Sequence, residues 1–530
     1  MLKRADFPEQ LGIDSNKIID LINYYKDIKM RADNFMVIRD GVVATEFHYS
    51  PNSANTPHAM YSLSKTITST AIGIAWDEGI IDLDTKIFVK YFPDKLARLS
   101  GQQKEWAEKM TIHDVISMRA GKATGVLENK EKNNWLDAIL DVKTVFEPGT
   151  DWKYVSENAY VLSYILQLET GMTMTEYLTP RLYEPLGMEV PHWEKSQQGV
   201  DAGGWGLKLT AEDLAKISIL YVNKGEYFGK RIFSEEWFNK AVTPYTQKTY
   251  PIFTSNTQYG YQIWIDHENN DTTYRFTGLY GQFIFMYPEY NTGIVLMASD
   301  NRDYELIHSI YDRFPDAFVE KTDVAPKSAD ELKAIAASLK VDPKLKNAVQ
   351  RNSEIEKRIN NRNIKLVPMA NLSTQGASTY FMWRKKIGHM NDIKFVFNKT
   401  YFEFSFKEKD SERATIKVGL NGEFIHNELI LGENPCSIDA VGAWNKDGSL
   451  EMFLYNTGNP QTKRFKFKFG KKMVSVLTKV DPGYADIAKF NIEFNNGFEV
   501  KGPLLKGIQI GAPLFELFYA DPNTVGYFED

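Results

Sequence analysis

The chain has 530 residues, of which 43% are hydrophobic and 25% are charged, and its formal net charge is −6. This length exceeds one ordinary hydrophobic core, so we expect at least two domains with the composition of a soluble globular protein. The negative charge disfavours a nucleic-acid-binding protein, which usually carries a basic surface.

The single cysteine, Cys436, excludes an intramolecular disulfide, and the sequence has no cysteine cluster or HExxH motif for zinc. We therefore expect no metal and no cofactor. The basic residues near the N-terminus are not followed by the apolar stretch of an export signal, and no apolar run reaches about 18 residues. We expect a cytoplasmic protein with no membrane partner.

Residues 1–322 predict a mixed region of helices and strands. A helix over 15–28 comes first, and Asp40-Gly41 between two apolar runs predicts a hairpin. A helical middle part and a second group of strands follow, with a last helix at about 302–314. The expected helices are 62–77, 111–118, 155–169, 174–183, 210–223 and 234–240, and the expected strands are 259–266, 273–278, 282–288 and 293–299. This order suits one antiparallel sheet covered by helices.

The composition changes near residue 322. Residues 323–363 are polar, charged and helix-prone and contain no aromatic residue, which indicates a linker or a connecting helix pair. Residues 364–530 alternate like short strands, with turns at Asn398-Lys399, Asp447-Gly448 and Asn496-Gly497. This pattern predicts an all-β domain, either a sandwich or a small barrel.

One Ser-x-x-Lys sequence, Ser62-Leu-Ser-Lys65, precedes a predicted helix. The spacing places Ser62 and Lys65 on one helix face, and the helix N-terminus offers unpaired N–H groups and a partial positive charge. A lysine in a poorly solvated site can lose its proton near neutral pH and activate the hydroxyl. The simpler alternative is a serine cap followed by a surface lysine.

Ser62-Leu-Ser-Lys65 resembles the first motif of class C β-lactamases and their relatives, which include D-alanyl-D-alanine carboxypeptidases, β-lactamase-like esterases and 6-aminohexanoate-dimer hydrolases. After the Pro148-Gly149 turn, Tyr154-Val-Ser156 matches the Tyr-x-Ser form of the second motif, which is more typical of the esterase and amide-hydrolase branches. The resemblance runs continuously from about residue 5 to 320. It implies an α+β fold, a β-lactamase/transpeptidase-like antiparallel sheet flanked by helices. The C-terminal part loosely resembles the small, lipocalin-like barrel that some of these proteins carry.

The resemblance also implies roles. Ser62 is the nucleophile, and Lys65 and Tyr154 form the base system, without deciding which of them takes the proton. The backbone N–H groups of Ser62 and Leu279 would form the oxyanion hole, and Ser156 would position Tyr154, Lys65 or the substrate. By itself Tyr154 could be a core aromatic residue, and Ser156 could be a helix cap.

The third motif of the family is Lys-Thr-Gly or His-x-Gly on a strand beside the nucleophile. Phe276-Thr277-Gly278 occupies this place, so Gly278 keeps its position but Phe276 stands where the cation would be. Gly278 could also be a simple turn or bulge glycine. Arg275 is expected to point to the opposite face of the strand. Because that cation helps hold the substrate carboxylate, its loss disfavours β-lactamase and carboxypeptidase activity.

We therefore expect a serine hydrolase that cleaves an ester or amide of a small substrate through an acyl-enzyme on Ser62. A D-amino-acid peptidase, carboxypeptidase or penicillin-binding protein is the alternative enzyme, and a catalytically silent binding protein on the same scaffold is the alternative outside the enzymes. The sequence leaves open whether the protein forms a homodimer. The C-terminal domain could cap the active site, dimerise, bind a ligand or act only as a stabilising domain.

Overall fold

The computed structural model describes most of the chain in two compact units. The segments outside the described residues are 124–133, 247–255, 269–270, 346–347, 350, 368–371, 376–389, 408–411, 432–433, 486–487, 490–491, 493–499, 516–522 and 530. The first unit contains Met1–Tyr49 and Ser53–Leu339, and the second contains Ser50–Asn52 and Lys340–Asp530. The unit boundary therefore falls inside the segment 323–363, for which we predicted a linker.

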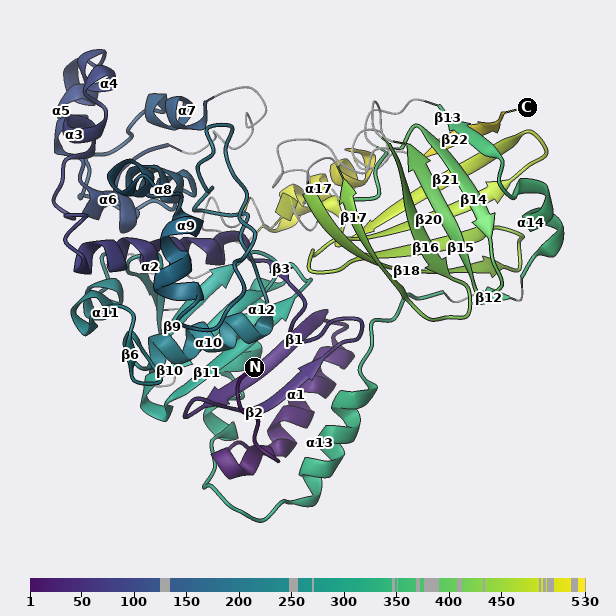
Figure 1. The fold of residues 1–530 in the computed structure, drawn as a ribbon, viewed down its shortest axis with the longest axis horizontal. Helices are drawn as coiled ribbons and strands as arrows, with labels where there is room; N and C mark the ends of the chain where they lie inside the picture. The colour runs from purple at the N-terminus through teal and green to yellow at the C-terminus, as the bar shows by residue number, and fades with distance from the viewer. Residues whose placement is uncertain are drawn as a thin grey trace. The chain divides into compact units, whose positions relative to one another are not determined.

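The first unit is built on a seven-stranded antiparallel sheet (Figure 1). In spatial order its strands are β2 (Val42–His48), β1 (Ala32–Arg39), β11 (Thr292–Ala298), β10 (Gln282–Tyr287), β9 (Asp271–Gly278), β8 (Trp264–Glu268) and β7 (Thr257–Tyr259). The predicted hairpin joins β1 to β2. Asp40 and Gly41 both have positive φ angles, 53° and 76°, as a tight two-residue hairpin turn requires.

Helices cover both faces of this sheet. On one face Tyr221 of α10 packs edge to face on Phe276 of β9, and on the other Tyr311 of α12 packs edge to face on Phe285 of β10. The helices of this unit are α1 (Ser15–Asp27), α2 (Ser64–Asp77), α3 (Ile87–Tyr91), α4 (Pro93–Ala97), α5 (Gly101–Lys109), α6 (Ile112–Ile116), α7 (Trp135–Asp141), α8 (Glu157–Thr170), α9 (Met174–Leu178), α10 (Ala211–Val222), α11 (Glu235–Ala241), α12 (Asp303–Tyr311) and α13 (Lys327–Ser338). The helix α13 lies against α1.

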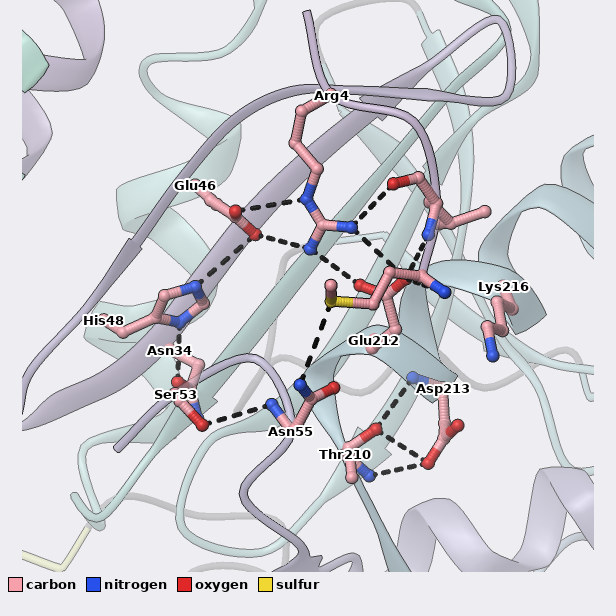
Figure 2. A network of polar contacts seen from close by, with 12 residues as sticks. Arg4, Asn34, Glu46, His48, Ser53, Asn55, Thr210, Glu212, Asp213 and Lys216 are labelled. Carbon is pink, nitrogen blue, oxygen red and sulfur yellow. Dashed lines mark hydrogen bonds and ion pairs between the residues drawn. The ribbon is translucent and has the colours of Figure 1, made fainter. Parts of the chain in front are cut away.

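A polar network ties the N-terminal residues to the sheet and to α10 (Figure 2). The Arg4 guanidinium lies 2.7 Å from the Glu212 carboxylate of α10 and 3.1 Å from the Glu46 carboxylate of β2. Further along, the Asn34 amide is within hydrogen-bond distance of both His48 (2.7 Å) and His58 (3.2 Å). Since His58 belongs to β3 (His58–Ala59), which pairs with β4 (Lys208–Leu209), the network fixes the chain just before Ser62.

The second unit is a closed β-barrel. Among its described residues, nine strands form a ring in which β18 pairs with β16 on one side and with β19 on the other. In order around the ring they are β18 (Asn434–Asn445), β16 (Arg413–Gly419), β15 (Tyr401–Lys407), β14 (Asp392–Phe397), β13 (Asn363–Leu366), β22 (Thr524–Phe528), β21 (Met473–Asp481), β20 (Thr462–Phe469) and β19 (Leu450–Asn456). β17 (Ile425–Leu431) and β12 (Ala348–Val349) pair with β18, and the helices are α14 (Ser353–Ile359) and α17 (Gly502–Phe515).

Phenylalanine side chains dominate the core of the barrel. Six fully buried ones, with Trp444, belong to a single apolar cluster: Phe395, Phe402, Phe404, Phe406, Phe465 and Phe467. The all-β prediction for the C-terminal domain is thus confirmed, and of the two predicted forms the barrel is the one observed. Ile359 of α14 joins this cluster, so the second half of the predicted linker packs with the barrel. The described residues include no helix with the length and apolar character needed to cross a bilayer.

Candidate active site

Ser62 lies in η2 (Tyr61–Leu63), a single turn directly before α2. Its side chain is partly exposed, whereas Lys65, one turn further along, is 1% exposed. The Lys65 Nζ atom donates one hydrogen bond to Ser62 Oγ (2.8 Å) and one to the carbonyl oxygen of Gly204 (2.8 Å). The structure thus brings the hydroxyl and the amine of the Ser-x-x-Lys sequence into direct contact.

Burial decides the protonation of Lys65. Loss of solvent around the ammonium group lowers its pKa from 10.5 to about 7, although the negative charge of Glu157 acts in the opposite direction. Glu157 is the first residue of α8 and is itself buried. At neutral pH a large fraction of Lys65 is therefore an uncharged amine that can accept a proton.

Tyr154 completes the group. Its hydroxyl is hydrogen-bonded to Ser62, and the Lys65 Nζ atom lies 4.9 Å from the centroid of its ring. Burial raises the pKa of Tyr154 above its ordinary value, against the smaller effect of the Ser62 hydrogen bond. The Trp264 ring stacks on Tyr154 at 6.0 Å between centroids. A phenolate is thus disfavoured at this position, and the tyrosine is a neutral hydroxyl held by aromatic packing.

Gly203 and Gly204, which we did not predict from the sequence, form another wall of the candidate site. A Cβ atom on Gly203 would lie 2.4 Å from the Ala159 carbonyl oxygen, and one on Gly204 would lie 2.4 Å from that of Ser156. Only glycines let this loop press against the start of α8. The close approach presents the Gly204 carbonyl to Lys65. The Gly-Gly pair was the available signal, but nothing local to it indicates a partner 139 residues away.

The end of β9 runs beside the segment Met60–Leu63, which contains Ser62. β8 pairs with β9 only as far as Arg275, and beyond it Gly278 lies against the segment Met60–Leu63. A Cβ atom on Gly278 would lie 2.1 Å from the carbonyl oxygen of Met60, so a side chain cannot be accommodated. Leu279 follows directly, which places its backbone next to the turn that carries Ser62.

The structure explains the missing cation of the third motif. Phe276 is fully buried and packs on Tyr221 of α10. Arg275 points to the other face, as expected from strand alternation, where its guanidinium binds the Asp266 carboxylate at 2.9 Å and donates to Thr277 Oγ1 at 2.6 Å. Both members of the ion pair are 0% exposed. The charge of Arg275, which directly precedes the third motif in the chain, is therefore neutralised within the protein.

Ser156 is the remaining predicted site residue, and His58 is a histidine of β3 that was not among the predicted site residues. Ser156 precedes α8, but its side chain makes no capping hydrogen bond, so the alternative role as helix cap is not observed. His58 is 2% exposed beside Asn34, and burial lowers its pKa. The described residues contain no group of three or more histidine, cysteine or acidic side chains that could hold a metal ion.

A comparison with protein families identifies this arrangement. The family model described as "Beta-lactamase" matches residues 21–312, which include Ser62, Lys65, Tyr154 and Gly278. The chain belongs to the β-lactamase family. It is a hydrolase of this family, and the fold expected from the resemblance is confirmed.

Individual relatives of this β-lactamase-family protein are distant. The 6-aminohexanoate-dimer hydrolase of Paenarthrobacter ureafaciens is 24% identical over 289 residues, which cover 50% of this chain and 72% of that protein. A provisionally named D-alanyl-D-alanine carboxypeptidase of Salmonella agona is 25% identical over 211 residues, 34% of this chain. That match covers 48% of the carboxypeptidase, about half its length.

Solved structures of the family are similar to this chain at low sequence identity. A family VIII carboxylesterase is 17% identical with a TM-score of 0.45, and the match covers 59% of this chain and 99% of the esterase. An octameric penicillin-binding protein homologue from Pyrococcus abyssi is 15% identical with a TM-score of 0.46, over 88% of this chain and 98% of that structure.

Proposed function

We propose that this β-lactamase-family protein is a serine hydrolase that cleaves small esters or amides through an acyl-enzyme on Ser62. The observation that carries the proposal is the 2.8 Å contact between Lys65 Nζ and Ser62 Oγ at a lysine whose pKa is lowered to about 7. A nucleophilic hydroxyl needs an adjacent base of this kind, since a serine hydroxyl by itself is a weak nucleophile at neutral pH.

Acylation starts from uncharged Lys65. As Ser62 Oγ attacks the substrate carbonyl carbon, its proton passes to Lys65 Nζ and the carbonyl π electrons move to the oxygen. The backbone N–H groups of Ser62 and Leu279 donate to this oxyanion, an interaction typically worth about 3–4 kcal/mol per donor in the transition state. Collapse of the tetrahedral intermediate breaks the bond to the leaving group. Tyr154 donates its hydroxyl proton to the leaving group and regains a proton from the Lys65 ammonium.

Deacylation repeats these steps with water. Lys65, again uncharged, accepts a proton from the attacking water, through Tyr154 or directly, and a second tetrahedral intermediate forms. When it collapses, the acyl–oxygen bond to Ser62 breaks, the acid is released and the proton returns to Ser62 Oγ. The raised pKa of Tyr154 favours a mechanism in which Lys65 is the base and Tyr154 transfers protons without remaining ionised.

The surroundings of the third motif favour substrates without a free carboxylate. Arg275 is committed to Asp266, and Phe276 is buried against Tyr221, so neither offers a charge to a substrate. A D-alanyl-D-alanine peptide would have to bring its terminal carboxylate to this edge without a cation from these residues. We therefore rank the carboxypeptidase alternative below a short-chain esterase or amidase.

The test is hydrolysis of p-nitrophenyl acetate and butyrate, with intact-mass detection of an acyl adduct, for the wild type and for Ser62→Ala. Ser69→Ala is the control, because Ser69 is a buried serine in α2, seven residues beyond Ser62 in the chain. We expect turnover and an adduct in the wild type and in Ser69→Ala, and neither in Ser62→Ala. Equal turnover in Ser62→Ala would reject the nucleophile.

The same assay separates the alternatives. Release of D-alanine from a D-Ala-D-Ala peptide at a higher kcat/KM than ester hydrolysis would favour the peptidase. A wild type that neither turns over these compounds nor forms an adduct with an active-site phosphonate would favour a binding protein without catalysis.

A further inference from the structure

Two tyrosines beside the active site have unusual backbone conformations. Tyr61 has a φ angle of 47° and Tyr280 one of 65°. Positive φ is uncommon for residues with a side chain, and strained residues of this kind gather at functional sites. Tyr61 directly precedes Ser62, and Tyr280 directly follows Leu279. Each strained residue therefore adjoins one of the two N–H donors of the proposed oxyanion hole.

The two side chains meet each other. Their ring centroids are 5.3 Å apart at an interplanar angle of 62°, an edge-to-face contact of the kind that aromatic pairs prefer. Both residues are buried, Tyr61 at 4% and Tyr280 at 1% exposure. A side-chain contact thus connects the turn that carries Ser62 with the turn after β9.

The turn after β9 is fixed at both ends by glycines. Gly278 touches the Met60 carbonyl, and on the far side a Cβ atom on Gly281 would lie 2.5 Å from Leu306 of α12 and 2.8 Å from the Ala298 side chain. The Tyr280 carbonyl also accepts a hydrogen bond from Gln282 Nε2 at 3.2 Å. Since both ends are held, we expect the position of the Tyr280 ring to affect the direction of the Gly278–Leu279 peptide, which carries the Leu279 N–H group.

We propose that the Tyr61–Tyr280 contact is a positioning device that aligns the backbone N–H groups of Ser62 and Leu279 toward one oxyanion. This inference rests on the proposed function, in which these two groups stabilise the tetrahedral intermediate. Donors of this kind act only when their hydrogens point at the place that the oxyanion will occupy. In this role the tyrosines act through the backbone of the neighbouring residues, so they are positioning residues and not catalytic ones.

The decisive variants are Tyr61→Gly and Tyr280→Gly. Glycine adopts positive φ without strain, so these changes remove the ring and leave the backbone conformation allowed. Tyr61→Phe and Tyr280→Phe keep both rings and remove only the hydroxyls. Tyr280→Asn is a second ringless variant that tolerates positive φ, in case the glycine variants fold poorly. Tyr290→Ala is the control, since its ring stacks on Phe318 at 4.0 Å at the other end of β10.

The measurements are kcat and KM for p-nitrophenyl butyrate and the infrared carbonyl stretch of the acyl-enzyme made from the carbon-13-labelled ester. In the glycine variants we expect kcat to fall by about 10–100-fold with KM changed less than about three-fold, because only the transition state loses stabilisation. The carbonyl band should move to higher wavenumber, since weaker hydrogen bonds polarise it less. The phenylalanine variants and Tyr290→Ala should resemble the wild type.

The double glycine variant tests whether the two rings act as one device. We expect it to lose no more than the worse single variant, because either change already breaks the contact. Multiplicative losses, or an unchanged carbonyl band in acylated glycine variants, would overturn this inference and leave the proposed function standing. A wild type that forms no adduct on Ser62 would overturn both.

Discussion

Lys65 sets the pH dependence that we expect for the enzyme. Its pKa is lowered to about 7 by burial, and only the uncharged amine can take the proton of Ser62. The kcat/KM for p-nitrophenyl acetate should therefore rise with pH and level off above an apparent pKa of about 7. Initial rates across this range measure the profile. A rate that continues to rise toward pH 10 would instead indicate a solvated lysine of ordinary pKa.

Replacement of this lysine provides the control. Arginine stays charged at any working pH, so Lys65→Arg should lower kcat/KM by about 10²–10⁴-fold even though it keeps a cation and donors. Lys216→Arg is the matched change, because Lys216 is also buried and donates to a backbone carbonyl, that of Gly187. Activity that survives in Lys65→Arg would exclude Lys65 as the base.

Tyr154→Phe separates proton transfer from packing. The phenyl ring keeps the stacking on Trp264, while the hydroxyl that bonds to Ser62 is lost. We expect kcat to fall by about 100-fold or more, with the apparent pKa of about 7 retained, because Lys65 remains the base. Disappearance of that pKa from the profile of the variant would assign the base to Tyr154.

At the scale of elements, the contact between β9 and the segment Met60–Leu63 depends on Gly278. An alanine there would place its Cβ atom 2.1 Å from the Met60 carbonyl oxygen, so the strand end or the turn must move. We expect Gly278→Ala to lower the free energy of unfolding by about 1–3 kcal/mol and to reduce kcat, measured by urea unfolding and ester hydrolysis. Gly511→Ala, with open space around it, should change neither by much.

The ion pair between β8 and β9 is a second test at this scale. Burial alone would raise the pKa of Asp266, but the Arg275 charge and hydrogen bonds lower it. Its contribution to stability is therefore present above the unfolded pKa of about 3.9 and is lost as the pH falls through the lower folded value. Asp266→Asn leaves a buried guanidinium without its charge partner and should destabilise by about 3–5 kcal/mol in urea unfolding at pH 7. A loss below about 1 kcal/mol would indicate that solvent reaches Arg275.

Local sequence patterns predicted where helices and strands lie better than they predicted the contacts between them. Helices were expected at 62–77 and 210–223 and are found at Ser64–Asp77 and Ala211–Val222, because apolar spacing and capping act within one segment. The single strand expected at 259–266 is instead β7 and β8, separated by a turn. There Gly260 lies against the Ala241 carbonyl and Gln262 has a positive φ angle. Such a break depends on a distant partner and leaves little local signal.

In the candidate site, too, the sequence predicted the local contact but not the contacts between distant segments. Ser62 and Lys65 share one helical turn, so their spacing alone predicted contact. Gly204, by contrast, reaches Lys65 across 139 residues of chain. No motif encodes the burial of Lys65 or the nearby charge of Glu157. The expected turn at Asn496-Gly497 lies outside the described residues.

For the whole molecule we expect two unfolding transitions, because each unit has its own core. Asn52 belongs to the barrel unit, where its amide donates to the Tyr455 hydroxyl at 2.7 Å and both residues are buried. Asn52→Ala should lower the stability of the barrel transition by about 1–3 kcal/mol and leave the other transition in place, as calorimetry would show. A change in stability confined to the transition of the first unit would reject the assignment of Asn52 to the barrel unit.

The membership of Ser50–Asn52 in the barrel unit has a consequence for synthesis on the ribosome. Asn52 and Tyr455 are 403 residues apart in the chain. At about 5–20 residues per second, Asn52 emerges about 20–80 s before its partner is translated. The nascent chain therefore carries this short segment, ten residues upstream of Ser62, without its final contacts until the barrel strands appear. The hydrogen bond of Asn52 is therefore completed only after β19, which carries Tyr455, has been translated.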